Sequence, residues 1–351
     1  MNDGAGGRRT DIDGLGTSEI VADERRFLAG RVLVVAFEGW NDAGDAASTT
    51  VRMLKDSLEV VPLAEVDPEL YFDYQFSRPT LSRDEEGHSS IHWPSAVLYG
   101  PARSSGMPVG LADDAELMVS GANTGNVFLL LGTEPSRGWK SFTAELLDAA
   151  LAADVEAVVL LGSMLADVPH TRPISVFSSS PNAEVRAELD LERSTYEGPV
   201  GILSIFEHAA EQVGLPTVAV WASVPHYVHN APSPKATLAL IDRLEELIDV
   251  TIPRGDLVEE SAAWEAGIDA LAADDEDMAA YIRQLEQARD TVDSPEASGE
   301  AIAREFERYL RRRGDGPGGP GGPGGPGGPG GPGGPGLGPG GRGDGPRRGR
   351  D

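Results

Sequence analysis

Short apolar runs alternate with amphipathic stretches between residues 29 and 252. The runs predict strands at Val32–Phe37, Ala96–Tyr99, Val127–Leu131, Val155–Leu161 and Thr217–Val224. Their apolar residues do not alternate with polar ones, which is typical of strands covered on both faces. Between the strands, apolar residues recur at helical spacing, and Ser233-Pro234 supplies a cap and a first-turn proline for one such helix. The pattern predicts an α/β domain over residues 29–252 with a mostly parallel sheet.

Residues 253–313 carry helical patterns alone, and we predict an acidic α-helical extension there. Apolar stripes run over 257–271, 278–285 and 302–310. Residues 255–310 contain sixteen acidic side chains and four arginines. This charge is explained either by a solvated face on a helical hairpin or by a docking surface for a basic partner.

The two ends of the chain differ in composition from the rest, and no core can be built from the C-terminal one. Residues 314–351 consist almost entirely of Gly, Pro, Arg and Asp, with a Gly-Gly-Pro repeat. A second glycine in each triplet removes the stiffness of a collagen triple helix, so we predict a disordered tail. Residues 1–28 are rich in Gly and Asp and lack the apolar core of a secretory signal, so we predict a disordered N-terminal segment.

Composition excludes several classes of function. The 57 acidic and 29 basic side chains give a net charge of -28, which argues against nucleic-acid binding. The absence of cysteine excludes disulfides, thiolate nucleophiles and iron–sulfur clusters. The apolar runs are too short to span a bilayer. We therefore expect a soluble cytoplasmic protein with no membrane partner.

Two loops that follow predicted strands contain glycines and charged residues. The loop 38–45 leads into a helix near Ala46, whose N-terminus would offer free amides. Its three carboxylates make a phosphate a poor ligand there. The loop 132–141 is similar to a phosphate-binding P-loop, but five residues separate Gly132 from Gly138 and Trp139 precedes Lys140, so the spacing fails.

Two further loops, 162–173 and 225–229, contain His170, His226 and His229. These histidines could bind a metal if carboxylates joined them, or His226 and His229 could simply hydrogen-bond the loop backbone. We favour the second interpretation and predict no metal site. A triad of Ser163, a histidine and Asp42 can be drawn, but the chain has no G-x-S-x-G elbow.

The candidate ligand or interface residues therefore lie in or beside the strand-end loops. They are Trp40, Asn41, Asp42, Glu134, Arg137, Trp139, His170, Arg172, Trp221, His226 and Tyr227. Aromatic residues with a few polar groups are typical of a small-molecule pocket and equally of a protein interface. The sequence identifies no catalytic residue and predicts no cofactor.

The same stretches resemble the PAC2 family, the proteasome assembly chaperone 2 family, over about residues 30–310. The similarity is strongest to its longer bacterial branch with a helical C-terminal extension. It is carried by residues 37–47, 74–79, 132–135, 139, 162–173, 198–201, 225–228 and 232–237. The resemblance implies a three-layer sandwich similar to the purine nucleoside phosphorylase-like fold. It also implies a protein that acts by association, because family members help proteasome subunits assemble.

Two hypotheses follow. The first is a non-catalytic assembly chaperone or scaffold that acts as a homo-oligomer, with itself and proteasome subunits or another protein as partners. Several family members insert a hydrophobic-Tyr-X tail into the proteasome α-ring, whereas this chain ends in Arg347–Asp351. The alternative is a hydrolase or a glycosyl-transferring enzyme that uses a pocket at the carboxyl ends of the strands.

Overall fold

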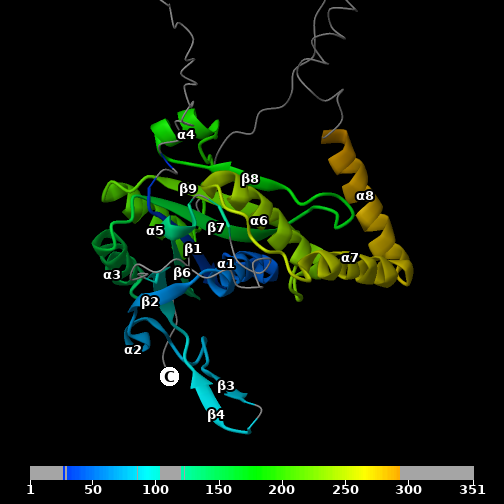
Figure 1. The fold of residues 1–351 in the computed structure, drawn as a ribbon. Helices are drawn as coiled ribbons and strands as arrows, with labels where there is room; N and C mark the ends of the chain where they lie inside the picture. The colour runs from blue at the N-terminus through cyan, green and yellow to red at the C-terminus, as the bar shows by residue number, and fades with distance from the viewer. Residues whose placement is uncertain (1–26, 28–29, 85, 103–119, 122, 293–351) are drawn as a thin grey trace, which may run out of the picture. The chain divides into compact units, whose positions relative to one another are not determined.

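A computed structural model describes residues 27, 30–84, 86–102, 120–121 and 123–292 (Figure 1). The predicted tail, the third helical stripe at 302–310 and nearly all of the predicted N-terminal segment lie outside these residues. Phe27, at the end of that segment, is buried in the core, and its amide donates to the Glu188 carboxylate.

A seven-stranded sheet in the order β2-β5-β6-β1-β7-β9-β8 forms the centre of the described chain. Its strands are β1 Val32–Glu38, β2 Val60–Glu65, β5 Ala96–Pro101, β6 Val127–Thr133, β7 Ala157–Ala166, β8 Val176–Ser179 and β9 Thr217–Pro225. The central strands β6, β1, β7 and β9 are parallel, whereas β5 and β8 run antiparallel to their neighbours. The carboxyl ends of the parallel strands therefore meet at one edge of the sheet.

Helices cover both faces of the sheet. On one face, α1 (Ala46–Ser57) and α6 (Pro234–Ile248) pack in a core with alternate residues of the central strands. On the other, α3 (Trp139–Ala152) and α5 (Ile202–Gln212) pack in a second core with the remaining residues. Both faces are buried, which explains the unbroken apolar runs. The predicted three-layer α/β fold with a mostly parallel sheet is confirmed (Figure 1).

The helical extension is also present, as α7 (Leu257–Ala273) and α8 (Glu276–Val292). The remaining elements are α2 Pro68–Tyr71, β3 Thr80–Arg83, β4 Ser89–His92, α4 Ala183–Leu189 and the short 3-10 turns η2 Ala43–Asp45, η4 Thr124–Asn126 and η5 His226–Val228. Strands β3 and β4 form a separate two-stranded sheet, which extends away from the seven-stranded one in Figure 1.

All five predicted strands lie within or overlap observed ones, and most of the elements that the sequence analysis missed are exposed. The sequence analysis missed β2, β8 and the β3–β4 hairpin, which are edge or two-stranded segments with mostly exposed or half-buried side chains. It also missed α5, although Ile202, Leu203, Phe206 and Ala210 recur at helical spacing and are buried.

Candidate functional site

The loop after β1 turns tightly and places a carboxylate on the next helix. Gly39 and Gly44 have φ values of 115° and 63°, in the region that favours glycine. The Asp42 Oδ1 atom accepts hydrogen bonds from the amides of Ala47, at 2.8 Å, and Ser48, at 3.2 Å. The amides that the sequence suggested as free are therefore occupied by Asp42, so that this helix end does not offer an anion site.

Backbone and side-chain bonds attach this loop to the end of β7. The Ser163 amide donates to the Asn41 carbonyl at 2.8 Å, and the Ser163 hydroxyl donates to the Ala43 carbonyl at the same distance. Ser163 is fully buried. The triad drawn from the sequence is not assembled, because the hydroxyl serves the loop and the His170 ring contacts Tyr227 and Asp269 instead.

Glu134 lies behind the loop and joins it to α5. Its Oε1 atom accepts hydrogen bonds from the Ile202 amide at 2.8 Å and from Asn41 Nδ2 at 3.2 Å. A carboxylate at a helix N-terminus is favoured by the helix dipole. Gly201 is required here, because a Cβ atom on it would lie 2.3 Å from Asn41 Oδ1.

A cavity of about 800 Å³ opens at this end of the sheet. Four of the predicted residues line it: Trp40, Asn41, Asp42 and Trp221. The other lining residues used below are Asp45, Phe177, Tyr196, Glu207 and His229. Trp40, Phe177 and Tyr196 are 64%, 43% and 65% exposed, so the cavity has an aromatic mouth.

Two of the carboxylic acids that line the cavity have raised pKa values. Burial raises the pKa of Glu207 to about 7, and the neighbouring Glu211 carboxylate acts in the same direction. Burial also raises the pKa of Asp42, against the hydrogen bonds that Ala47 and Ser48 donate to it. Among the described residues that line the cavity there is no lysine or arginine.

Arg137 and Trp139 lie apart from the cavity and serve the structure around α2 and α3. The Arg137 guanidinium donates to the carbonyls of Glu69, at 2.7 Å, and Leu70, at 3.2 Å. The Trp139 indole N–H donates to the Pro135 carbonyl at 2.7 Å. These bonds connect the loop 133–138 to α2 and begin α3.

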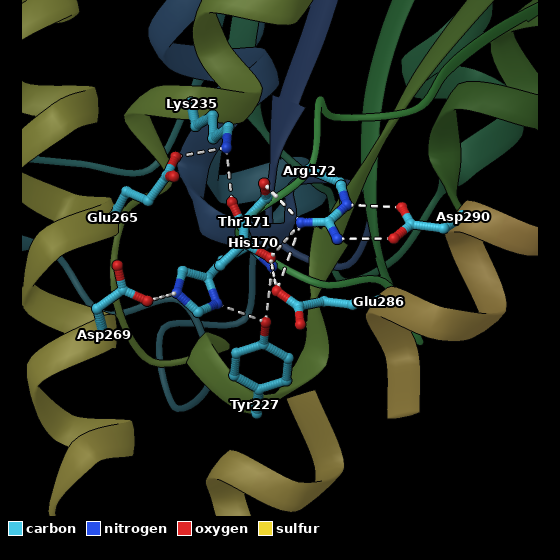
Figure 2. Close-up of polar contacts among 9 residues, drawn as sticks. All are labelled: His170, Thr171, Arg172, Tyr227, Lys235, Glu265, Asp269, Glu286 and Asp290. Atoms are coloured by element: carbon cyan, nitrogen blue, oxygen red, sulfur yellow. Dashed lines mark hydrogen bonds and ion pairs between the residues drawn. The ribbon is translucent and has the colours of Figure 1, made fainter. Parts of the chain in front are cut away.

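His170, Arg172 and Tyr227 form a second group, to which α7 and α8 are attached (Figure 2). His226 lies beside Tyr227 and Tyr281. The His170 side chain is fully buried, with Nδ1 2.9 Å from the Tyr227 hydroxyl and Nε2 3.1 Å from Asp269 of α7. Burial is the main cause that raises the pKa of Tyr227 to about 12, so the phenol is neutral. A neutral phenol can donate to Nδ1, which leaves Nε2–H to donate to Asp269.

Arg172 and Thr171 bind α8. Arg172 makes a two-pronged ion pair with Asp290, with nitrogen–oxygen distances of 2.7 and 2.8 Å, and this pairing holds the pKa of Asp290 below its usual value. The Thr171 hydroxyl donates to Glu286. Lys235 of α6 adds a bond to Glu265 of α7 at 2.5 Å. Figure 2 shows these contacts converging on residues 170–172.

The two histidines of the loop 225–229 have different contacts. His226 Nδ1 lies 3.2 Å from the Asp167 carboxylate, and its ring stacks edge-on against Tyr281 of α8. His229 Nδ1–H donates to the His226 carbonyl at 2.9 Å, so its Nε2 is an acceptor in the neutral ring. The predicted backbone hydrogen bond is thus observed for His229, whereas His226 contacts a carboxylate and a tyrosine.

Some acidic residues of the helical extension therefore bind other parts of the same chain, a role that the sequence analysis did not consider. Glu265, Asp269, Glu286 and Asp290 all contact the chain's own loop 170–172 or Lys235. The sequence analysis named Lys235 only as part of a motif of the resemblance and did not name Glu207, because each lies in an ordinary amphipathic helix and only packing reveals its neighbours.

Within the described residues, no group of three or more acidic or histidine side chains is arranged to hold a metal ion. In the same part of the chain, none of the helices has the length and apolarity needed to cross a membrane.

Comparison with known proteins places the chain in a family. The model of the PAC2 family matches residues 36–272. A PAC2 family protein from Streptomyces avermitilis is 44% identical, with 71% of this chain and 98% of that chain covered and a TM-score of 0.60. A proteasome-assembly chaperone homologue from Mycobacterium tuberculosis is 38% identical, with 72% and 99% covered and a TM-score of 0.59.

An archaeal proteasome activator from Pyrococcus furiosus shares the fold at 12% identity, with 71% of this chain and 96% of that chain covered and a TM-score of 0.51. No curated protein matches the chain. The match of the family model over most of the described chain, together with two relatives more than 30% identical, shows that this chain belongs to the PAC2 family.

Proposed function

We propose that this chain acts by binding other protein chains, as a proteasome-related assembly chaperone, and that it does so as a homo-oligomer joined through the β3–β4 hairpin. The observation that carries the proposal is the uncovered state of this hairpin. The Mycobacterium tuberculosis relative, named a proteasome-assembly chaperone homologue, supports proteasome subunits as the further partner.

None of the described residues covers a face of the hairpin. All eight residues of β3 and β4 are exposed. Leu81 and Ile91 are directly opposite each other across the ribbon and are 62% and 59% exposed. Phe76 and Trp93, which flank the ribbon, are 83% and 50% exposed. A two-stranded ribbon is marginally stable alone, and an apolar cross-strand pair gains its stability by burial.

Charge favours a second copy of this chain as the partner that buries the exposed apolar residues of the hairpin. Two chains with a net charge of -28 repel each other over most of their surfaces. Residues 76–93 are nearly neutral by comparison, with two arginines against three acidic residues and two histidines. The hairpin is thus a nearly neutral element with an exposed apolar pair, at which two acidic copies can approach with little repulsion.

The test compares Leu81→Thr/Ile91→Thr with Ser82→Thr/Ser90→Thr, a matched pair on the opposite face of the ribbon. Native mass spectrometry and light scattering measure the oligomeric state at micromolar concentration. We expect the first variant to associate at least about tenfold more weakly than the wild type, and the second to associate normally. A monomeric wild type, or equal association of both variants, would contradict self-association through the hairpin.

The chaperone role is tested separately. Purified proteasome subunits from the source organism are mixed with the full chain, and the rate of ring formation is followed by native mass spectrometry. A faster rate or a stoichiometric complex with the subunits is expected. Unchanged assembly and no complex would refute a proteasome-related role, whatever the oligomeric state.

A further inference from the structure

The cavity at the strand ends is separate from the hairpin and takes no part in association through it. It lies beside β1, β7, β9 and β8, whereas the hairpin branches off between β2 and β5, at the other side of the sheet order. Its volume of about 800 Å³ lies within the range of small-molecule pockets. The residues that line the cavity therefore indicate which ligand this half of the sheet can bind.

Two buried acceptors that line the cavity are without partners. Asn41 and Asp42 are 1% and 5% exposed, and neither Asn41 Oδ1 nor Asp42 Oδ2 has a hydrogen-bond partner among the described residues. Buried acceptors without donors are costly, and nearly all such atoms in proteins are satisfied. Both residues line the cavity, but the two atoms themselves are shielded from its surface, so a donor from outside the chain reaches them only when the side chains of Asn41 and Asp42 turn toward it.

The charged groups of the cavity also require a donor rather than an acceptor. Asp42, Asp45 and Glu207 contribute carboxylates. Glu207 lies on α5 and has another carboxylate, Glu211, one turn away. A phosphate or carboxylate ligand would be repelled, because no lysine or arginine stands among the described lining residues.

Aromatic side chains complete the lining. Trp221 lies against Gly162, where a Cβ atom would come within 2.6 Å of the indole ring. Trp40, Phe177 and Tyr196 stand at the mouth with large exposed fractions. Aromatic faces beside carboxylates attract ammonium and guanidinium groups through the ring quadrupole, and the same rings cover an apolar body.

We propose that this cavity binds an organic cation, an ammonium or guanidinium group carried on an apolar body. The cation pairs with the carboxylates of Glu207 and Asp42, its N–H groups supply the missing donors, and its apolar part packs on the aromatic residues. The same chemistry is offered by a free amine and by a lysine or arginine side chain of a polypeptide.

Isothermal titration of the full chain with three probes of equal shape tests the charge. The probes are 4-phenylbutylammonium, neutral 4-phenylbutanol and anionic 4-phenylbutyrate. We expect the ammonium probe alone to bind. Equal binding of all three, or binding of none at millimolar concentration, would overturn the proposal.

Variants assign the binding to this cavity. Glu207→Gln keeps the shape of the side chain and is expected to weaken ammonium binding about tenfold. Trp40→Ala, at an exposed position that tolerates truncation, is expected to weaken it about threefold. Glu59→Gln, an exposed glutamate before β2, is the control and should leave binding unchanged. Identical affinities in Glu207→Gln and the wild type would place the cation elsewhere and refute the assignment.

Two further probes distinguish the sources. Agmatine represents a free amine, and an arginine-rich peptide represents a polypeptide ligand. Tighter binding of agmatine indicates a small-molecule ligand, and tighter binding of the peptide indicates a side chain of a partner protein. Failure of both probes to bind would contradict the proposal. The hairpin variant Leu81→Thr/Ile91→Thr should bind the probes normally, so the two proposals fail independently.

Discussion

The glutamate in the cavity makes the stability of the fold depend on pH in a calculable direction. Burial and Glu211 raise the pKa of Glu207 from 4.5 to about 7 in the folded chain. Between these values the folded state binds more protons than the unfolded state, so the free energy of unfolding falls as the pH rises through this window. The loss is complete above about pH 7, where the ionised carboxylate remains partly desolvated.

The magnitude follows from the shift. Each pKa unit corresponds to about 1.4 kcal/mol, so the shift sets an upper limit of about 3 kcal/mol. Glu207 is only partly buried and water screens it, so we expect about 1–2 kcal/mol. Glu207→Gln removes the charge with little change in volume. The variant should therefore be more stable than the wild type by about 1–2 kcal/mol at about pH 8, and nearly equal to it at about pH 4.5.

Urea unfolding of both proteins across this pH range, followed by circular dichroism, measures the difference. The Glu59→Gln variant serves as the control, because its side chain is exposed and its removal should give a difference independent of pH. Asp42 leaves a residual slope of the same sign in all three proteins. A Glu207→Gln variant whose stability difference is the same at both ends of the range would refute the desolvation argument.

Two further predictions concern packing. Gly201→Ala should lower the free energy of unfolding by about 1–3 kcal/mol, because its Cβ would meet the Asn41 side chain. Gly267→Ala, in α7 with open space around it, should raise the free energy of unfolding by about 0.5–1 kcal/mol. Urea unfolding of both variants measures the contrast, and equal effects would contradict the close approach of Gly201 to Asn41. Tyr227→Phe should lower the free energy of unfolding by about 1–3 kcal/mol, because the Tyr227 hydroxyl accepts a hydrogen bond from the His170 amide at 2.7 Å and contacts the His170 ring. An unchanged free energy of unfolding would show that these contacts contribute nothing to stability.

Local sequence signals were sufficient for the centre of the fold. The unbroken apolar runs predicted the parallel strands, because strands covered on both faces need no polar positions. Ser233 and Pro234 predicted the start of α6, and the structure places Ser233 at its N-cap with a side-chain bond to the Ala236 amide. The edge strands and the hairpin were missed, because exposed strands have no apolar pattern that distinguishes them from loops.

The sequence indicated which loops follow the strands, but it did not predict how the candidate residues are grouped. Trp40, Asn41, Asp42 and Trp221 share a cavity, whereas His170, Arg172 and Tyr227 bind the helical extension. The sequence gives the distance of each residue from the end of its strand. It does not give the face of the sheet to which the following loop folds, which depends on the packing of later helices.

The sequence by itself determined the properties that depend on composition and local periodicity: the strong negative charge, the absence of thiol chemistry, the α/β order of elements and the helical extension. The tertiary structure alone decided which charges are used internally. Glu286 and Asp290 are more than a hundred residues from Arg172 along the chain, so their ion pairs exist only because the fold brings these segments together. Glu207 and Asp42 are likewise far apart in the sequence and line one cavity only in the folded chain. Electrostatic energies depend on distance in space and on burial, neither of which is written in the order of residues.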